Sequence, residues 1–185
     1  MRILYGETNN KSIRSFLSLT KEEVLRRIEA DHGYHEVIPM IDNNVLLRVY
    51  IDTDLYGTDP QAVLEDSLQA LNAYFKTTDS DWAICSCNRP DGDQYKISYH
   101  IISKVYCMKL EDMRKAGSQL KARGLHMDES VYWFDLNDHE DNAYLRLPNQ
   151  TKHSINKPAP PLIILQGELS DFLVTDVSGL QIHPP

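Results

Sequence analysis

The chain has 185 residues, of which 42% are hydrophobic and 25% charged, and its formal net charge is −8. This length and composition are typical of one soluble domain that buries a core without disulfide or metal staples. No apolar run approaches the roughly 20 residues that cross a bilayer, which excludes a membrane-spanning helix. The N-terminal stretch is too short in apolar residues and too soon acidic for a signal peptide, so an intracellular protein is expected.

Capping residues, hydrophobic spacing and Gly or Pro breaks predict helices alternating with strands along the chain. For example, Thr20 and Glu23 match a capping box, and Gly33 is a typical helix stop. In chain order the expected elements are a helix over 21–31, strands over 36–38 and 45–54, a helix from 59 to about 76, strands over 82–87 and 95–102, a helix over 110–123, and short strands near 131–134, 144–147 and 162–166. This alternation predicts an α/β or α+β domain without ordering the sheet.

Three cysteines, Cys85, Cys87 and Cys107, are present. An odd count with Cys-x-Cys spacing is a poor disulfide framework, and it lacks the second ligand pair of a structural zinc site. Free cysteine is among the most buried residue types, so these thiols are expected to pack along buried strands.

An Asp-x-Asp pair, Asp52 and Asp54, ends the strand expected over residues 45–54. Side chains two apart on a strand point to the same side, so both carboxylates are directed at one place. Oxygen ligands of this kind suit hard cations such as Mg²⁺ and Mn²⁺. The alternative is a solvated pair of acids at a strand end.

The strand expected over residues 95–102 carries Lys96, Ser98 and His100 on one face and apolar residues on the other. A cation, a hydroxyl and an imidazole at two-residue steps form a row of donors suited to phosphate oxygens. The alternative is the wet face of a half-exposed sheet.

A third group lies further along the chain. Asp128 offers another carboxylate, Arg146 offers a planar fork of donors suited to phosphate, and Lys152 adds a point charge. Each of these residue types is also common in surface ion pairs, so this group is informative only together with the other two.

The order of these groups resembles that of the archaeo-eukaryotic primase superfamily, and within it the primase-polymerases and the primases of large DNA viruses. Those proteins carry acidic-x-acidic, Ser-x-His and a later acidic residue as core motifs in this order. The segment 34–39 also looks like the lead-in to the first metal motif of the primase-polymerases, and Arg146 with Lys152 looks like their nucleotide-phosphate element. The resemblance covers roughly residues 34–152.

The resemblance implies a DNA primase or polymerase that joins NTPs or dNTPs on a single-stranded DNA template, either making or extending a primer. It implies that two Mg²⁺ or Mn²⁺ ions are held by Asp52, Asp54 and Asp128. It implies nucleotide contacts from Lys96, Ser98, His100, Arg146 and Lys152, with His100 also among the catalytic residues. The fold it implies is a single domain over residues 1–185, in which an N-terminal α/β unit packs on a unit like an RNA-recognition sheet, with the active site between them.

The chain departs from the family in two ways. Many primase-polymerases have Glu at the position of Asp54, and a shorter carboxylate there can alter metal preference. The sequence also contains neither a zinc-binding module nor the Gly-x-x-x-x-Gly-Lys-Ser/Thr phosphate loop of an appended helicase. Our hypothesis is that this is the N-terminal piece of a longer replication protein that carries a C-terminal helicase or zinc-binding domain. The resemblance to viral primases suggests that it acts inside a virus-infected host cell.

Two other function classes fit some of the same residues. A domain that grips nucleotide or primer-template and catalyses little by itself agrees with the acidic net charge, because affinity for phosphates comes from Lys and Arg. A metal-dependent nuclease or phosphohydrolase would use the paired aspartates but explains the row of Lys96, Ser98 and His100, and Arg146, less well. Of the tyrosines beside the motifs, Tyr99 is expected in the core, and Tyr50 remains a candidate for base stacking.

Overall fold

The computed structural model describes residues 2–8, 11–125, 142–153 and 158–184. In chain order the elements are β1 (Arg2–Thr8), β2 (Lys11–Leu19), α1 (Lys21–Arg27), β3 (Tyr34–Pro39), β4 (Leu46–Gly57), α2 (Pro60–Phe75), the 3₁₀ turn η1 (Asp79–Asp81), β5 (Trp82–Ser86), β6 (Arg89–Asp91), β7 (Gln94–Lys109), α3 (Leu110–Ala122), β8 (Asn142–Arg146), β9 (Ile163–Gln166), η2 (Leu169–Phe172) and β10 (Gln181–Ile182). The mixed α+β class predicted from the sequence is confirmed.

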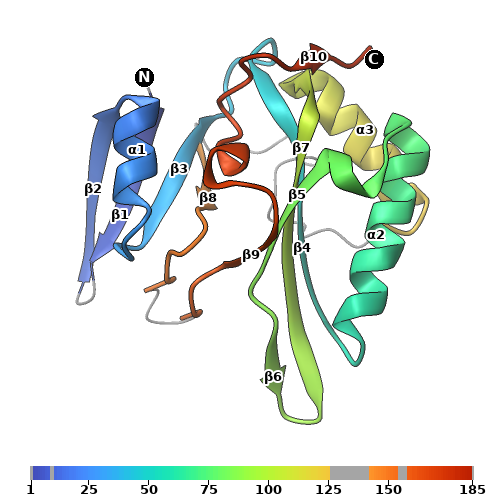
Figure 1. Ribbon diagram of the computed structural model, residues 1–185, viewed down its shortest axis with the longest axis horizontal. Helices are drawn as coiled ribbons and strands as arrows, with labels where there is room; N and C mark the ends of the chain where they lie inside the picture. Colours follow the sequence, from blue (N-terminus) through green and yellow to red (C-terminus); the bar gives the residue numbers. More distant parts are fainter. Residues whose placement is uncertain (1, 9–10, 126–141, 154–157, 185) are drawn as a thin grey trace.

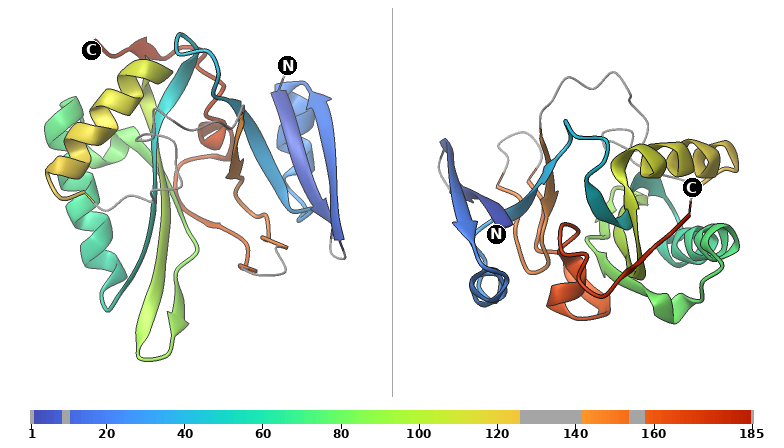
Figure 2. Two further views of the ribbon diagram at one scale, coloured as in Figure 1. Left: turned by 180° about the vertical axis from the view of Figure 1, so that it is seen from behind. Right: turned by 90° about the horizontal axis from the view of Figure 1, so that it is seen from above.

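The strands form two sheets. One has the order β2-β1-β3-β8, and the other has the order β10-β7-β5-β9, with β4 and β6 also paired to β7. Helices α2 and α3 cover one face of the six-stranded sheet, and the four-stranded sheet lies on its other side (Figure 1). The views from behind and from above show the same arrangement (Figure 2). No helix in the described ranges has both the length and the apolar character needed to cross a membrane.

Strand β7 organises the six-stranded sheet. It pairs antiparallel with β4 from Leu46↔Lys109 to Gly57↔Tyr95, while β6, β5 and β10 follow one another along its other edge. Because side chains alternate along a strand, even-numbered and odd-numbered residues of the middle of β7 face opposite sides of the sheet. The two faces pack against different partners.

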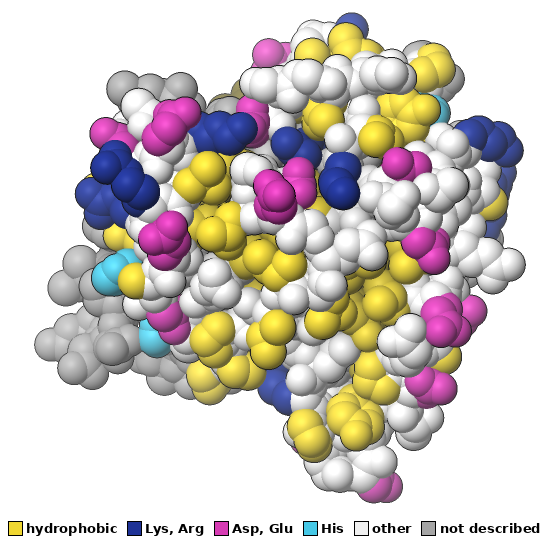
Figure 3. Space-filling view, viewed as in Figure 1, with side chains coloured by type: hydrophobic (Ala, Val, Ile, Leu, Met, Phe, Trp, Pro, Cys, Tyr) yellow, Lys and Arg dark blue, Asp and Glu magenta, His cyan; other side chains and the backbone are white. Residues whose placement is uncertain are grey.

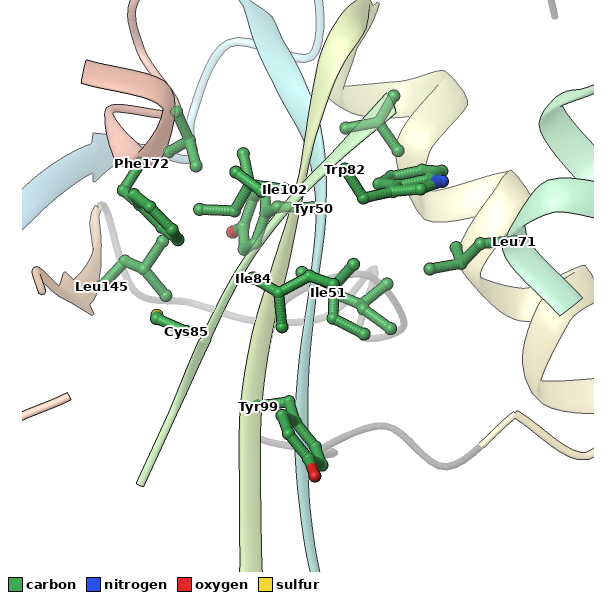
Figure 4. Close-up of a cluster of buried hydrophobic side chains, with 14 of the residues drawn as sticks. Tyr50, Ile51, Leu71, Trp82, Ile84, Cys85, Tyr99, Ile102, Leu145 and Phe172 are labelled. Carbon is green, nitrogen blue, oxygen red and sulfur yellow. The ribbon is translucent and has the colours of Figure 1, made fainter. Parts of the chain in front are cut away.

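The odd-numbered face packs against the helices. Tyr99 is 2% exposed and its hydroxyl donates to the carbonyl of Pro60 at the start of α2 (2.9 Å), so its expected place in the core is confirmed. Trp82 lies on the helix side with Leu71, and its indole nitrogen donates to the side-chain oxygen of Asn72 (2.9 Å) (Figure 4). This half of the core holds the helices on the sheet.

The even-numbered face packs against the C-terminal segment and β8. Tyr50 lies near Ile102, with Phe172 and Leu145 beyond them on the side away from the helices (Figure 4). Tyr50 is only 2% exposed, so its ring is not available to stack on a base, and that suggestion from the sequence is wrong. All three cysteines are buried free thiols, as expected.

Several element boundaries differ from those expected. The capping box of α1 is confirmed, but the helix ends at Arg27 instead of residue 31. The side chain of Gln150 donates to the carbonyls of Ile28 (3.1 Å) and Ala30 (3.0 Å), so a tertiary partner replaces the last helical turn. Residues 89–91, between two of the expected strands, form the short strand β6, and neither it nor β1 and β2 was anticipated.

Candidate active site

Three rows of side chains cross β4, β7 and β5–β6 on the even-numbered face of the sheet. Along β7 the rows are Asp52–His100–Cys85, Asp54–Ser98–Cys87 and Tyr56–Lys96–Arg89. The sequence predicted which residues share a face within each strand. The antiparallel register adds that Asp52 lies opposite His100 and Asp54 opposite Ser98, which brings the two motifs together.

Lys96 contacts both of its neighbours on β4. Its ammonium lies 2.6 Å from Oδ1 of Asp54 and 4.5 Å from the centre of the Tyr56 ring. The contact with Asp54 is ionic, without the geometry of a directed hydrogen bond. Lys96 therefore neutralises one of the two candidate metal carboxylates.

His100 is buried and lies next to Asp52, with Nε2 3.6 Å from Oδ1. Burial, together with the nearby charge of Arg146 and the imidazole of His35, lowers the pKa of His100 to about 3, although a hydrogen bond with the backbone of Arg146 opposes this shift. The imidazole is therefore neutral near pH 7, and its contact with Asp52 is not an ion pair. A neutral imidazole serves as a hydrogen-bond donor without adding charge.

Two residues of the four-stranded sheet lie near His100. His35 of β3 and Arg146 of β8 are cross-strand partners, and both affect the titration of His100. Burial, followed by the charge of Asp52, strongly raises the pKa of the Cys85 thiol, so Cys85 stays protonated and is not a nucleophile. His35 and Cys85 were not identified from the sequence, because only the pairing of distant strands places them here.

Arg146 fastens the segment that follows β8. One guanidinium nitrogen, Nη1, lies 2.7 Å from the carbonyl of Pro160, 3.3 Å from that of Gln150 and 3.4 Å from that of Ala159. Arg146 thus combines a structural role with its position beside His100. Its predicted contact with nucleotide phosphates stays a prediction.

Of the remaining predicted residues, the one that the structure describes is not brought to the rows. Lys152 forms an isolated antiparallel bridge with Ala159 through its backbone, and among the residues that the structure describes no side-chain contact joins it to the rows. Asp128 lies outside the described residues.

Asp52 and Asp54 fit a hard divalent cation in their chemistry. Mg²⁺ keeps several waters and is commonly held by one or two carboxylates together with substrate phosphates. Within the described ranges no group of three or more His, Cys, Asp or Glu side chains is arranged to hold a metal ion. A metal ion held by Asp52 and Asp54 would therefore need further ligands, from phosphate oxygens and from Asp128, which lies outside the described residues.

Asp31 ties the loop before β3 to the segment after β8. Its carboxylate accepts hydrogen bonds from the backbone of Gly33 (3.2 Å), from the backbone of Thr151 (2.8 Å) and from the Thr151 hydroxyl. Partial burial acts to raise the pKa of Asp31, but these hydrogen bonds outweigh it and hold the pKa below its ordinary value. These hydrogen bonds restrain the backbone of the segment that follows Arg146.

We expect Asp31→Asn to lower the free energy of unfolding by about 1 kcal/mol at neutral pH. Folding lowers the pKa of this carboxyl, so its contribution is present above about pH 4, the unfolded value, and is lost as the pH falls through the folded value. Urea unfolding of both proteins at pH 7 and near pH 2 measures this effect. A stability difference that stays the same at the lower pH would contradict the role of the ionised carboxylate.

Arg89 and Tyr56 are two further residues of the rows that were not identified from the sequence. Arg89 lies in β6 opposite Lys96, and its Nη1 donates to the carbonyl of Cys87 (3.0 Å). The alternation over residues 89–91 is too short to signal a strand.

No protein-family model matches the chain, and no curated protein matches it either.

Proposed function

We propose that this chain is the catalytic core of a DNA primase-polymerase that joins nucleotides on a single-stranded DNA template. The observation that carries the proposal is the pairing of the Asp-x-Asp strand with the Lys-x-Ser-x-His strand, row against row, on one face of a sheet. Metal-dependent nucleotidyl transfer requires carboxylates that hold the metal ions and, beside them, hydrogen-bond donors that bind the phosphate oxygens.

The arrangement of elements supports the family's two-unit core as part of this proposal. The order β4–α2–β5–β7–α3, with both helices on one face, follows the β-α-β-β-α pattern of ferredoxin-like and RNA-recognition sheets. The sheet formed by β2, β1, β3 and β8 would then be the N-terminal unit. In this proposal the nucleotide binds on the even-numbered face, toward His35 and Arg146.

The side chains would act mainly by position and charge. Lys96, Ser98 and neutral His100 would donate to oxygens of the triphosphate, and Arg146 would offset charge that develops on them. Asp52 and Asp54, with Asp128, would hold two divalent ions. When bound, such ions lower the pKa of the attacking 3′-hydroxyl and stabilise the leaving pyrophosphate.

The test is incubation of the purified chain with a primed single-stranded DNA, labelled NTPs or dNTPs, and Mg²⁺ or Mn²⁺, with and without EDTA. We expect metal-dependent extension that EDTA abolishes and that an Asp52→Ala/Asp54→Ala double variant lacks. The same assay compares ribonucleotides with deoxyribonucleotides, and an unprimed template tests initiation. A folded wild-type protein that incorporates no nucleotide under any of these conditions would overturn the proposal.

A nucleotide-binding module without strong catalysis is the second candidate. The net charge of −8 and the ion pair between Lys96 and Asp54 favour it, because both weaken the attraction for phosphates. Saturable binding of a labelled NTP without incorporation would support this candidate. Metal-dependent DNA cleavage without added nucleotides would instead support a nuclease.

A further inference from the structure

A β-ribbon projects from the body of the molecule next to the candidate active site. It consists of the end of β4 (residues 54–57), β6 and the start of β7 (residues 94–96). Figure 1 shows β6 and the start of β7 extending beyond the helices, and hydrophobic side chains gather on this projection in the space-filling view (Figure 3). The ribbon continues the sheet that carries Asp52 and Asp54.

One face of the ribbon combines an exposed aromatic ring with cations. Tyr56 is 54% exposed, and Lys96 lies over its ring at 4.5 Å. Arg89 is the cross-strand neighbour of Lys96, and within the described part of the chain only Nη1 of its guanidinium is engaged. Tyr56 is two residues beyond Asp54, so this row lies about 7 Å further along the strand.

We infer that this face is a contact surface for single-stranded nucleic acid, with a base stacked on Tyr56 and the backbone phosphates beside Arg89. The inference rests on the proposed function and names the surface that would hold the template or primer strand. Aromatic rings with nearby Arg or Lys are the usual means of holding bases without reading their sequence.

The openness of the ribbon favours a strand over a mononucleotide. A pocket for a small molecule buries most of its ligand on several sides, whereas a projecting ribbon offers one open face. A strand gains from such a surface because it continues into the neighbouring rows. The exposed acids Asp91 and Asp93 near the tip disfavour phosphates there, so the contact is confined to the Tyr56–Lys96–Arg89 row and the part toward Asp54.

The ribbon supplies its own matched control. Tyr95 is also exposed, at 39%, but it neighbours Lys96 in sequence and therefore points to the opposite face. Removing either ring changes the same residue type on the same ribbon. Only the Tyr56 change alters the proposed surface.

The experiment measures fluorescence anisotropy of a labelled dT20 oligonucleotide with the full chain at low salt, without added nucleotide. We expect Tyr56→Ala to weaken binding by about 5- to 10-fold, with Tyr56→Phe and Tyr95→Ala each within about twofold of wild type. Arg89→Gln is expected to weaken binding by about threefold and to reduce its salt dependence. Unchanged melting temperatures show that the variants are folded.

Three results would overturn the inference: no saturable binding by wild type, unchanged binding by Tyr56→Ala, or equal weakening by Tyr95→Ala. Nucleotide incorporation, measured separately, distinguishes this failure from failure of the proposed function. Tyr56-dependent binding without incorporation would keep the surface and remove the polymerase. Incorporation with unchanged binding by Tyr56→Ala would keep the polymerase and remove the surface.

Discussion

Replacing Asp52 by asparagine is expected to lower metal-dependent nucleotide incorporation by at least about 1,000-fold. The substitution keeps the size and shape of the side chain but removes the negative charge that a divalent ion needs. Loss of a metal that stabilises the transition state costs several kcal/mol, and each 1.36 kcal/mol is a factor of ten in rate. Asp52 lies opposite His100 in the middle of the paired strands, and the nearest carboxylate on the same face of β4 is that of Asp54, one row away opposite Ser98.

The control for Asp52→Asn is Asp66→Asn on the exposed side of α2, which makes the same chemical change away from the rows. Incorporation by the Asp66→Asn variant should match wild type. Both variants should retain the wild-type melting temperature and circular dichroism spectrum. Activity of Asp52→Asn within tenfold of wild type would remove Asp52 from the metal-binding set.

The second large effect is on stability. Glu36→Ala is expected to lower the free energy of unfolding by about 3 kcal/mol. The Glu36 carboxyl group is fully buried and accepts from the backbone of Val174 (2.7 Å) and from the backbone (3.3 Å) and hydroxyl (2.6 Å) of Thr175. Truncation removes the carboxylate that accepts from these three donors, and the loss of an acceptor from a buried donor costs more than the hydrogen bond itself contributes.

This tie also joins the two sheets. Glu36 belongs to β3, and the carbonyl of Val174 accepts from the backbone of Arg48 in β4 (2.8 Å). Urea unfolding should show Glu36→Gln only about 1 kcal/mol less stable than wild type. Its loss is smaller than that of Glu36→Ala because the amide oxygen still accepts from the backbone of Val174. The exposed Glu29→Ala should lie within about 0.5 kcal/mol of wild type. A Glu36→Ala protein as stable as Glu29→Ala would show that the tie does not hold the sheets together.

Local patterns in the sequence are enough to predict most of the helices and to predict which polar side chains share one face of each strand. The capping box at Thr20 and Glu23 and the N-cap at Asp59 are interactions within four residues, so their consequences are visible in the sequence. The same is true of the two-residue alternation that places Asp52 with Asp54, and Lys96 with Ser98 and His100.

Contacts between distant segments set the element ends that sequence analysis misplaced. The side chain of Gln150, which is distant in sequence, donates hydrogen bonds to the carbonyls of Ile28 and Ala30, and α1 ends before them. Tyr50 is on the expected face, but the C-terminal segment and β8 bury it, which local alternation does not foresee. Burial depends on what packs against a face, and the periodicity of one strand carries no information about that.

The α+β class, the burial of the three thiols and the two strand motifs are predictable from the sequence, because each depends on the type and spacing of neighbouring residues. The register of β4 against β7, which sets Asp52 opposite His100 and Asp54 opposite Ser98, is visible only in the folded protein. The same is true of the positions of His35 and Arg146 near His100 and of Arg89 beside Lys96 and Tyr56. Strand register is fixed by burial and turns over the whole sheet, so partners far apart in sequence become neighbours only on folding.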